Sequence, residues 1–444
     1  MRFDFVRARL SSLESDHRLI LAGMARVILF VAIGRLAGAA KEIALAYRFG
    51  IGELTDAYAT LITVVLWPVA LWLTAVSATI VPLEARTADA RAISQFRSEL
   101  TAGALTLGVL LSLAGMVFMK FAAAASAPGN SIAYSPVMLG MIPVGVLLLP
   151  QGLMIGLCST WTLGSGRHTN TLLEGVPALV VATAIIALPE LGASGLVWAT
   201  VAGFVAHLLL LAIPLVMRGE LPVPSVRFKS ALWRQFFSGF GLLLAGQALM
   251  ASVVLIDQAI AVGLGAGAPS TLSYSNRVLA FVMGLGALAV TRATLPVFVK
   301  AAERDPSGLF RVAGKWAFAM LICGLAAAAL SAWLAEPVVS LLFERGAFTH
   351  DDKVRVAALF RASLPQMPMF LAGLVLASVA SSRGRYGLIF AACASALLSK
   401  LAANALLVPH WGLIGLVLGW TVMYSVHAAV LLWGFMHSAS ADRT

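Results

Sequence analysis

Long apolar segments dominate this chain and limit what it can fold into. Charged residues make up only 11% of the sequence, against about 25% in soluble proteins, and the mean hydropathy is +0.93. A helix of about 20 apolar residues crosses the hydrocarbon core of a bilayer, so we predict an all-α polytopic membrane protein with about twelve transmembrane helices. The predicted helices lie near residues 19–40, 57–82, 100–124, 135–160, 172–189, 194–217, 235–264, 274–299, 312–335, 357–381, 387–408 and 412–435.

The positions of the basic residues indicate an orientation. Most lysines and arginines lie in the N-terminal segment and in alternate loops, which predicts that both termini are cytoplasmic. The net charge is +11, but basic loops of this kind meet anionic membrane lipid, so the charge does not indicate a nucleic-acid partner. The N-terminal segment MRFDFVRARLSSLESDHR precedes an apolar run too long for a signal peptide, and we expect a retained first span.

The two halves of the chain repeat one another. The segment PELGASGLV at 189–197 matches PHWGLIGLV at 409–417, and His207 matches His427. Each half holds an even number of predicted helices, so the halves share one orientation and are related by an axis along the membrane normal. We predict two six-helix lobes, residues 1–218 and 219–444, arranged as a V with a central cleft.

One outer loop carries a helix-start signal. Thr349 and Asp352, in the connection 336–356, have the spacing of a capping box. We therefore expect a helix to begin at this point, on the outer side of the membrane.

The usual catalytic constellations are missing from the sequence. There is no paired-carboxylate site, no H-E-x-x-H and no G-x-S-x-G motif. Cys158, Cys323 and Cys393 lie in apolar runs without metal-ligand spacing. We predict that the chain is not an enzyme and uses no cofactor or metal.

The first predicted helix carries charges that are costly inside a membrane. Arg35 lies about 24 Å along a helix that enters near Leu19, and Lys41 lies further out. Arg277 lies at a similar depth on the predicted helix 274–299, so both lobes place cations in the outer half of the membrane. Glu42 shares a helix face with Arg35 and can neutralise one of the cations. In the alternative interpretation, Lys41 and Arg277 only snorkel to the outer headgroups.

A second charged set lies within the C-terminal half. Asp257 and Lys400 are each costly alone in the middle of an apolar helix, which predicts a buried ion pair between them. Asn404 lies one turn from Lys400 on the same face. Two roles remain open for this set, a purely structural lock and a protonation-linked or ion-linked switch.

Three segments together resemble the MurJ (MviN) lipid II flippase family, within the multidrug/oligosaccharidyl-lipid/polysaccharide exporter superfamily. They are GRLAGAAKEIALAYRFGIGELTDAY at 34–58, SYSNRVLAF…GALAVTRATLPVFVK at 273–300 and LLFERGAFTHDD at 341–352. The resemblance implies a V-shaped bacterial inner-membrane flippase that moves undecaprenyl-diphosphate-linked sugars outward. It also implies that Arg35, Lys41 and Arg277 are cavity cations that bind the diphosphate. Glu42 and Asp56, the acidic residue of the family's DAF stretch, are expected in the same substrate site.

The sequence departs from that family in several places. The region WPVALWLTAVSATIVP has no charge where the family usually has a basic pair, and Asn276 replaces an acidic residue. Family members commonly have fourteen helices. Some bind sodium through an acidic residue that Asp257 matches, but here Lys400 and Asn404 occupy the partner helix.

These observations favour a flippase for a polyprenyl-diphosphate-linked saccharide, either lipid II or an exopolysaccharide repeat unit. A drug antiporter of the same superfamily is the alternative, although an exporter of cationic drugs needs carboxylates in its cleft. A non-transporting membrane scaffold would not need buried cations on both lobes. The sequence does not fix an oligomeric state and is compatible with a monomer.

Overall fold

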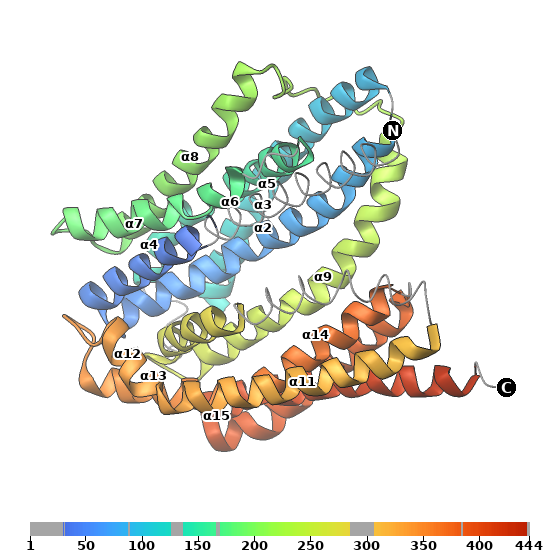
Figure 1. Ribbon diagram of the computed structural model, residues 1–444. Helices are drawn as coiled ribbons and strands as arrows, with labels where there is room; N and C mark the ends of the chain where they lie inside the picture. Colours follow the sequence, from blue (N-terminus) through green and yellow to red (C-terminus); the bar gives the residue numbers. More distant parts are fainter. Residues whose placement is uncertain are drawn as a thin grey trace, which may run out of the picture. The chain divides into compact units, whose positions relative to one another are not determined.

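A computed structural model describes residues 30, 32–87, 89–125, 136–165, 169–284, 306–382 and 385–441 (Figure 1). These residues form helices joined by turns and loops, with no β-strand in the described ranges. Residues 32–49 and 268–284 are helical. The other helices are α2 (Glu53–Arg86), α3 (Ala90–Ala125), α4 (Pro136–Gly145), α5 (Leu148–Gly164), α6 (Thr169–Leu173), α7 (Val176–Ala187), α8 (Ala193–Met217), α9 (Leu232–Gly263), α11 (Pro306–Trp333), α12 (Ala335–Phe343), α13 (His350–Ser363), α14 (Gln366–Ser382) and α15 (Tyr386–Ala441).

The helices have the length and composition of membrane spans. Within the described residues, six are long and apolar enough to cross a bilayer, or seven if the bent pair α13 and α14 counts as one span. The chain is therefore a multi-pass, all-α membrane protein, as the apolar runs predict. Several predicted features lie outside the described residues, namely the start of the first span, the span beyond residue 284 and the basic residues Arg26, Arg167, Arg292, Lys300, Arg383 and Arg443.

The chain forms two compact units that interleave along the sequence. Unit 1 consists of residues 1–44, 68–116 and 143–240, and unit 2 of residues 45–67, 117–142 and 241–444. In unit 1, glycines let helices approach closely: a Cβ on Gly108 would meet the backbone of Pro150, and one on Gly203 would meet Pro177. The lobes expected at 1–218 and 219–444 follow the sequence repeat and stay a prediction.

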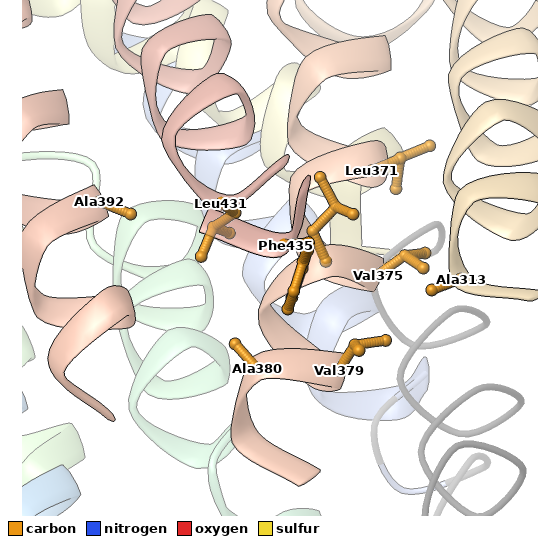
Figure 2. Close-up of a cluster of buried hydrophobic side chains, with 9 residues drawn as sticks. Ala313, Leu371, Val375, Val379, Ala380, Ala392, Leu431 and Phe435 are labelled. Atoms are coloured by element: carbon orange, nitrogen blue, oxygen red, sulfur yellow. The ribbon is translucent and has the colours of Figure 1, made fainter. Parts of the chain in front are cut away.

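Unit 2 has a buried apolar cluster where α14 packs against α11 and α15. Leu371, Val375 and Val379 of α14 contact Ala313 of α11 and Phe435 of α15, and all five are buried (Figure 2). This cluster holds the two ends of α15 together, because Ala392 and Leu431 belong to the same buried group.

The sequence repeat corresponds to a turn between two helices in each half. In the first half, Gly192 caps the start of α8 after the short turn that follows α7. At the matching position in the second half, Gly412 has φ 53° and interrupts α15 three residues after Pro409. A residue in this left-handed region is favoured when it is glycine. The α15 segment is therefore a helical hairpin, in which Gly415 lies against the backbone of Leu407.

The helix start expected at Thr349 is confirmed. The Thr349 hydroxyl accepts from the Asp352 amide at 3.2 Å, and the Asp352 carboxylate accepts from the Thr349 amide at 2.9 Å. These two bonds form a capping box at the first residues of α13.

Candidate functional site

A buried ion pair joins α9 to α15. Lys400 Nζ lies 3.0 Å from Asp257 Oδ1, and the two residues are 0% and 3% exposed. The pair that the sequence predicts from two isolated mid-helix charges is therefore present in unit 2. Because each charge has left water, the pair depends on its surroundings to satisfy the remaining donors and acceptors.

Polar groups bind both members of this pair. Lys400 Nζ also donates to the Leu416 carbonyl at 2.7 Å and to Asn404 Oδ1 at 3.2 Å, which uses its three N–H donors. Trp420 Nε1 donates to Asp257 Oδ2 at 2.5 Å, and Asn404 Nδ2 makes a longer contact of 3.4 Å with Asp257 Oδ1. The ammonium lies 5.2 Å from the centre of the Trp420 ring, within the range of a cation–π interaction. We call these five residues the Asp257 site.

The α15 hairpin is what assembles the Asp257 site. The turn at Gly412 brings the second arm back alongside the first, so that residues 416–420 face residues 400–404. Gly419 has no room for a side chain, because a Cβ there would lie 2.6 Å from Asn404 Oδ1 and 3.1 Å from Lys400 Nζ. Leu416 belongs to a buried apolar cluster with Ala261 and Val417. Trp420 packs against a second cluster, formed by Val253, Ala396 and Met423.

Sequence reasoning found Asp257, Lys400 and Asn404 but missed Trp420 and the Leu416 carbonyl. A usable signal was present, since Lys400 and Trp420 lie equally far from His410 in the turn PHWG. In an antiparallel helical hairpin, residues at equal distances from the turn face one another.

The charges of the first helix lie at the end of unit 1. Lys41 Nζ lies 2.9 Å from Glu42 Oε1, and both side chains are largely buried. Arg35 is half-buried on the same helix. The structure thus pairs Glu42 with its neighbour Lys41, while the pairing of Glu42 with Arg35 stays a prediction. Arg277 is exposed on the helix 268–284 of unit 2, and its convergence with the unit 1 cations also stays a prediction.

Asp56 is fully buried and holds the start of the helix that carries Arg277. Its two carboxylate oxygens accept from the amides of Gly267, at 2.6 Å, and Ser270, at 2.8 Å. These amides belong to the first turn of the helix 268–284, where backbone donors have no helical partner and the helix dipole favours an anion. The role that this geometry gives to Asp56 is to position that helix.

Further contacts surround Asp56 and join the three sequence segments of the family resemblance. Gln258 Nε2 donates to Thr60 Oγ1 at 2.8 Å, and the Tyr274 hydroxyl donates to the Gly50 carbonyl at 3.3 Å. The Ala347 amide donates to the Tyr47 carbonyl at 2.7 Å. We call the contacts of residues 47–60 with residues 258–274 and 343–348 the clasp. All of it lies within unit 2.

The loop at residues 344–348 fits the clasp because of two glycines, Gly346 in the loop and Gly50, which faces Ala347. Gly346 has φ 64°, and a Cβ there would collide with the Tyr47 carbonyl. The aromatic ring of Tyr274 packs against Phe343 and Phe348, with centroids 5.1 and 5.5 Å apart. The clasp is therefore a close backbone-to-backbone contact with an aromatic core. This geometry restricts which residues can stand at Gly346 and at the aromatic positions.

A further buried carboxylate, which sequence reasoning missed, lies in unit 1. Glu99 of α3 is 0% exposed. It accepts from the amides of Lys229 and Ser230, at 2.8 and 3.0 Å, and from Trp233 Nε1 at 2.7 Å. Gln95 Nε2 adds a fourth donor at 2.9 Å. Glu99 thereby fixes the segment that leads into α9.

Solved structures of other proteins have the same arrangement of helices as this chain. A lipid II flippase MurJ in an inward closed conformation matches with a TM-score of 0.77 and 16% identity, over 92% of this chain and 87% of that chain. A multidrug resistance MATE family transporter of the MOP superfamily, inward-facing, matches with a TM-score of 0.71 and 15% identity, over 94% of this chain and 99% of that chain. The described residues of this chain therefore have the fold that these two solved structures share.

The sequence comparison identifies the family. The family "Lipid II flippase MurJ" matches residues 178–443, more than half of the chain, and the chain belongs to this family. A probable lipid II flippase MurJ of Bdellovibrio bacteriovorus is 28% identical over 251 residues, which are 55% of this chain and 47% of that protein. The Vibrio cholerae protein of the same description is 29% identical over 188 residues, 41% of this chain and 35% of its own. The chain thus spans less than half the length of these relatives in the matched regions.

Proposed function

We propose that this chain is a flippase for a polyprenyl-diphosphate-linked saccharide, either lipid II or an exopolysaccharide repeat unit. It would move this lipid from the cytoplasmic to the outer leaflet of a bacterial inner membrane by alternating access. Family membership supports the transporter class. The observation that carries the choice of cargo is the positive charge of the first helix, where two cations, Arg35 and Lys41, accompany the one carboxylate of Glu42.

The cargo chemistry follows from these charges. A diphosphate is at least doubly anionic and is costly to bring out of water without cations. Arg35, Lys41 and Arg277 are proposed to bind its oxygens, with Glu42 orienting Lys41 through their ion pair. Asp56 contributes by holding the helix that presents Arg277. Like charges that repel in an empty site favour an open cleft, and bound diphosphate would draw the two lobes together.

The clasp is the proposed gate at the outer end of the cleft. It connects residues 47–60 of the first sequence repeat to residues 258–274 and 343–348 of the second. Rocking of two repeats about a central site requires such contacts to break on one side. The Asp257 site is proposed as a lock that keeps α9 attached to α15 while the clasp opens.

The orientation of the chain completes the proposal, with both termini in the cytoplasm and the connection 336–356 outside. Cysteine labelling tests it. A cysteine at Ala347 should react with an impermeant reagent from outside, whereas one at Ala302, which lies outside the described residues, should react only after permeabilisation. The reverse pattern would overturn this orientation.

A liposome assay tests the cargo. Purified protein is reconstituted with a fluorescent undecaprenyl-diphosphate-linked sugar, and flipping is followed by quenching from outside. Arg35→Ala and Arg277→Ala should each nearly abolish flipping at unchanged protein level, Arg35→Lys should retain part, and Lys41→Ala should be milder. Arg355→Ala, which removes an exposed cation of α13, is the matched control and should flip normally.

Three outcomes would overturn the proposal. Near-normal flipping by the double variant Arg35→Ala, Arg277→Ala would exclude the cationic binding of diphosphate. Equal flipping of the monophosphate-linked sugar would show that the diphosphate is not what the protein recognises. Uptake of a cationic drug without lipid flipping would favour the antiporter instead.

A further inference from the structure

A short irregular segment connects α8 to α9 and carries an unusual surface. We call residues 218–231 the strap. It begins directly after Met217, the last residue of a helix with the length and composition of a membrane span. The strap therefore starts at the level where the hydrocarbon core gives way to lipid headgroups.

The strap exposes apolar and cationic side chains side by side in the sequence. Val223 is 84% exposed, Val226 is 76% exposed and Phe228 is 49% exposed. Four cations on or next to the strap are also exposed, namely Arg218, Arg227, Lys229 and Arg234. Within the described part of the chain, these four side chains make no ion pair.

Hydrogen bonds at several points hold the backbone of the strap against other residues of unit 1. Glu99 binds the Lys229 and Ser230 amides, and the Ser225 amide donates to the Ser98 carbonyl at 3.1 Å. Phe228 has φ 47°, a conformation rare for a residue with a side chain. This turn aims the next two amides at Glu99 and lays the Phe228 ring 5.7 Å from that of Trp233.

The held backbone has a consequence for the exposed side chains. Arg227 and Lys229 flank a ring that packs against Trp233, so the backbone from which their side chains extend is in place before any ligand arrives. Preorganised donors lose less freedom on binding than donors on a flexible loop. The neighbouring end of α8 is also apolar and exposed, at Ile213, Val216 and Met217.

We propose that the strap is a binding site for the headgroup of an anionic phospholipid in the leaflet where α8 ends. Arg227 and Lys229 bind the phosphate oxygens, and Arg218 and Arg234 add positive charge around them. Val223, Val226 and the exposed end of α8 contact the upper part of the acyl chains. The position next to a membrane span and the mixture of cations with exposed apolar groups favour a lipid over a soluble anion. This site is separate from the proposed cargo site and does not depend on the proposed function.

Native mass spectrometry with defined lipids tests the proposal. Purified protein is titrated with phosphatidylglycerol or phosphatidylcholine, and the affinity of the first bound lipid is compared. The double variant Arg227→Gln, Lys229→Gln should bind phosphatidylglycerol more weakly, by about fivefold for each cation removed. Its affinity for phosphatidylcholine and its melting temperature without added lipid should not change, because both side chains are exposed.

A charge-matched control separates the site from general attraction. Arg91→Gln, Lys315→Gln removes two other exposed cations that the orientation places on the same side of the membrane, and it should leave phosphatidylglycerol binding at the wild-type level. Equal loss in both double variants would overturn the proposal, since it would mean that only net charge matters. Equal affinity of the wild type for the two lipids would also overturn it.

Discussion

Two buried carboxylates, Asp257 within α9 and Glu99 near the start of α9, are satisfied in opposite ways. Asp257, within α9, faces the ammonium of Lys400 at 3.0 Å. Glu99, on α3, faces the start of α9 and accepts four neutral N–H donors. Each also accepts from a tryptophan indole, Trp420 in the first case and Trp233 in the second.

The difference follows from where each carboxylate meets a helix. At the start of α9, as at the start of the helix 268–284 near Asp56, the first backbone amides have no helical partner and can bind an anion. Asp257 lies inside α9, where the amides are already used by the helix. A buried carboxylate in that position needs a cation from another helix, and Lys400 supplies it.

Removing the cation should have the largest effect. Lys400→Met leaves Asp257 buried without its counter-charge, so we expect a loss of about 3–5 kcal/mol in the free energy of unfolding. Asp257→Asn should also destabilise, because it leaves the ammonium unpaired. The double variant Lys400→Met, Asp257→Asn should recover part of the loss in thermal unfolding and in transport.

The double variant also provides the check on this interpretation. Residues in direct contact give non-additive effects, whereas independent residues give effects that add. Strictly additive losses would mean that the two charges do not meet in the folded protein.

Removing the Glu99 carboxylate, near the start of α9, should lower the free energy of unfolding by less. Glu99→Ala leaves the amides of Lys229 and Ser230 and the Trp233 indole without their acceptor, and we expect a loss of about 1–3 kcal/mol. Unlike Lys400→Met, it leaves no unpaired charge behind. Thermal unfolding measures the loss, and a Glu99→Ala loss larger than that of Lys400→Met would contradict the comparison.

Crowding the Asp257 site without changing its charge should have a smaller effect. Gly419→Ala places a methyl group against Asn404 and Lys400, and we expect a loss of about 1–2 kcal/mol. Gly387→Ala is the matched control on the same helix, since a Cβ there meets nothing within 4 Å. It should be neutral or slightly stabilising. Equal melting temperatures for the two variants would show that the site has spare room.

The smallest effect concerns dissolved cations. Because Lys400 Nζ already occupies the acceptors of Asp257, Asn404 and Leu416, the Asp257 site has no need of a sodium ion. Flipping in liposomes should therefore be the same when sodium is replaced by choline at constant ionic strength. A rate that falls with sodium removal would mean that a cation binds elsewhere or displaces Lys400.

Much of the fold could be predicted from the sequence, because the strongest signals are local. Apolar runs near 100–124, 194–217 and 235–264 correspond to α3, α8 and α9. The capping box at Thr349 and Asp352 was readable from spacing alone. The repeat around PELGASGLV and PHWGLIGLV predicts two halves, which stay a prediction, and in the structure both copies lie at a turn between helices.

The candidate sites were only partly predictable. A lone acid and a lone base within apolar helices imply a partner, so Asp257 and Lys400 could be matched from the sequence. Glu99 gave no such signal, because its partners are backbone amides, which every residue has. The assignment of Asp56 to the substrate site stays a prediction, and nothing in the sequence indicated that its two oxygens accept from the amides of Gly267 and Ser270.

The sequence by itself determined the class of this protein, because one helix after another is long and apolar enough to cross a membrane. It also predicts an orientation, from the bias of its basic residues, and two halves, from its repeat. These properties depend on the transfer of side chains from water to lipid, which acts residue by residue. Only the tertiary structure decided how the charges are satisfied. Lys400 binds groups on three helix segments, Glu99 accepts from amides of the strap, and Asp56 accepts from amides at the start of a helix. Such pairings depend on the turn at Gly412 and on which helix ends meet, and these are set by packing between residues far apart in the chain.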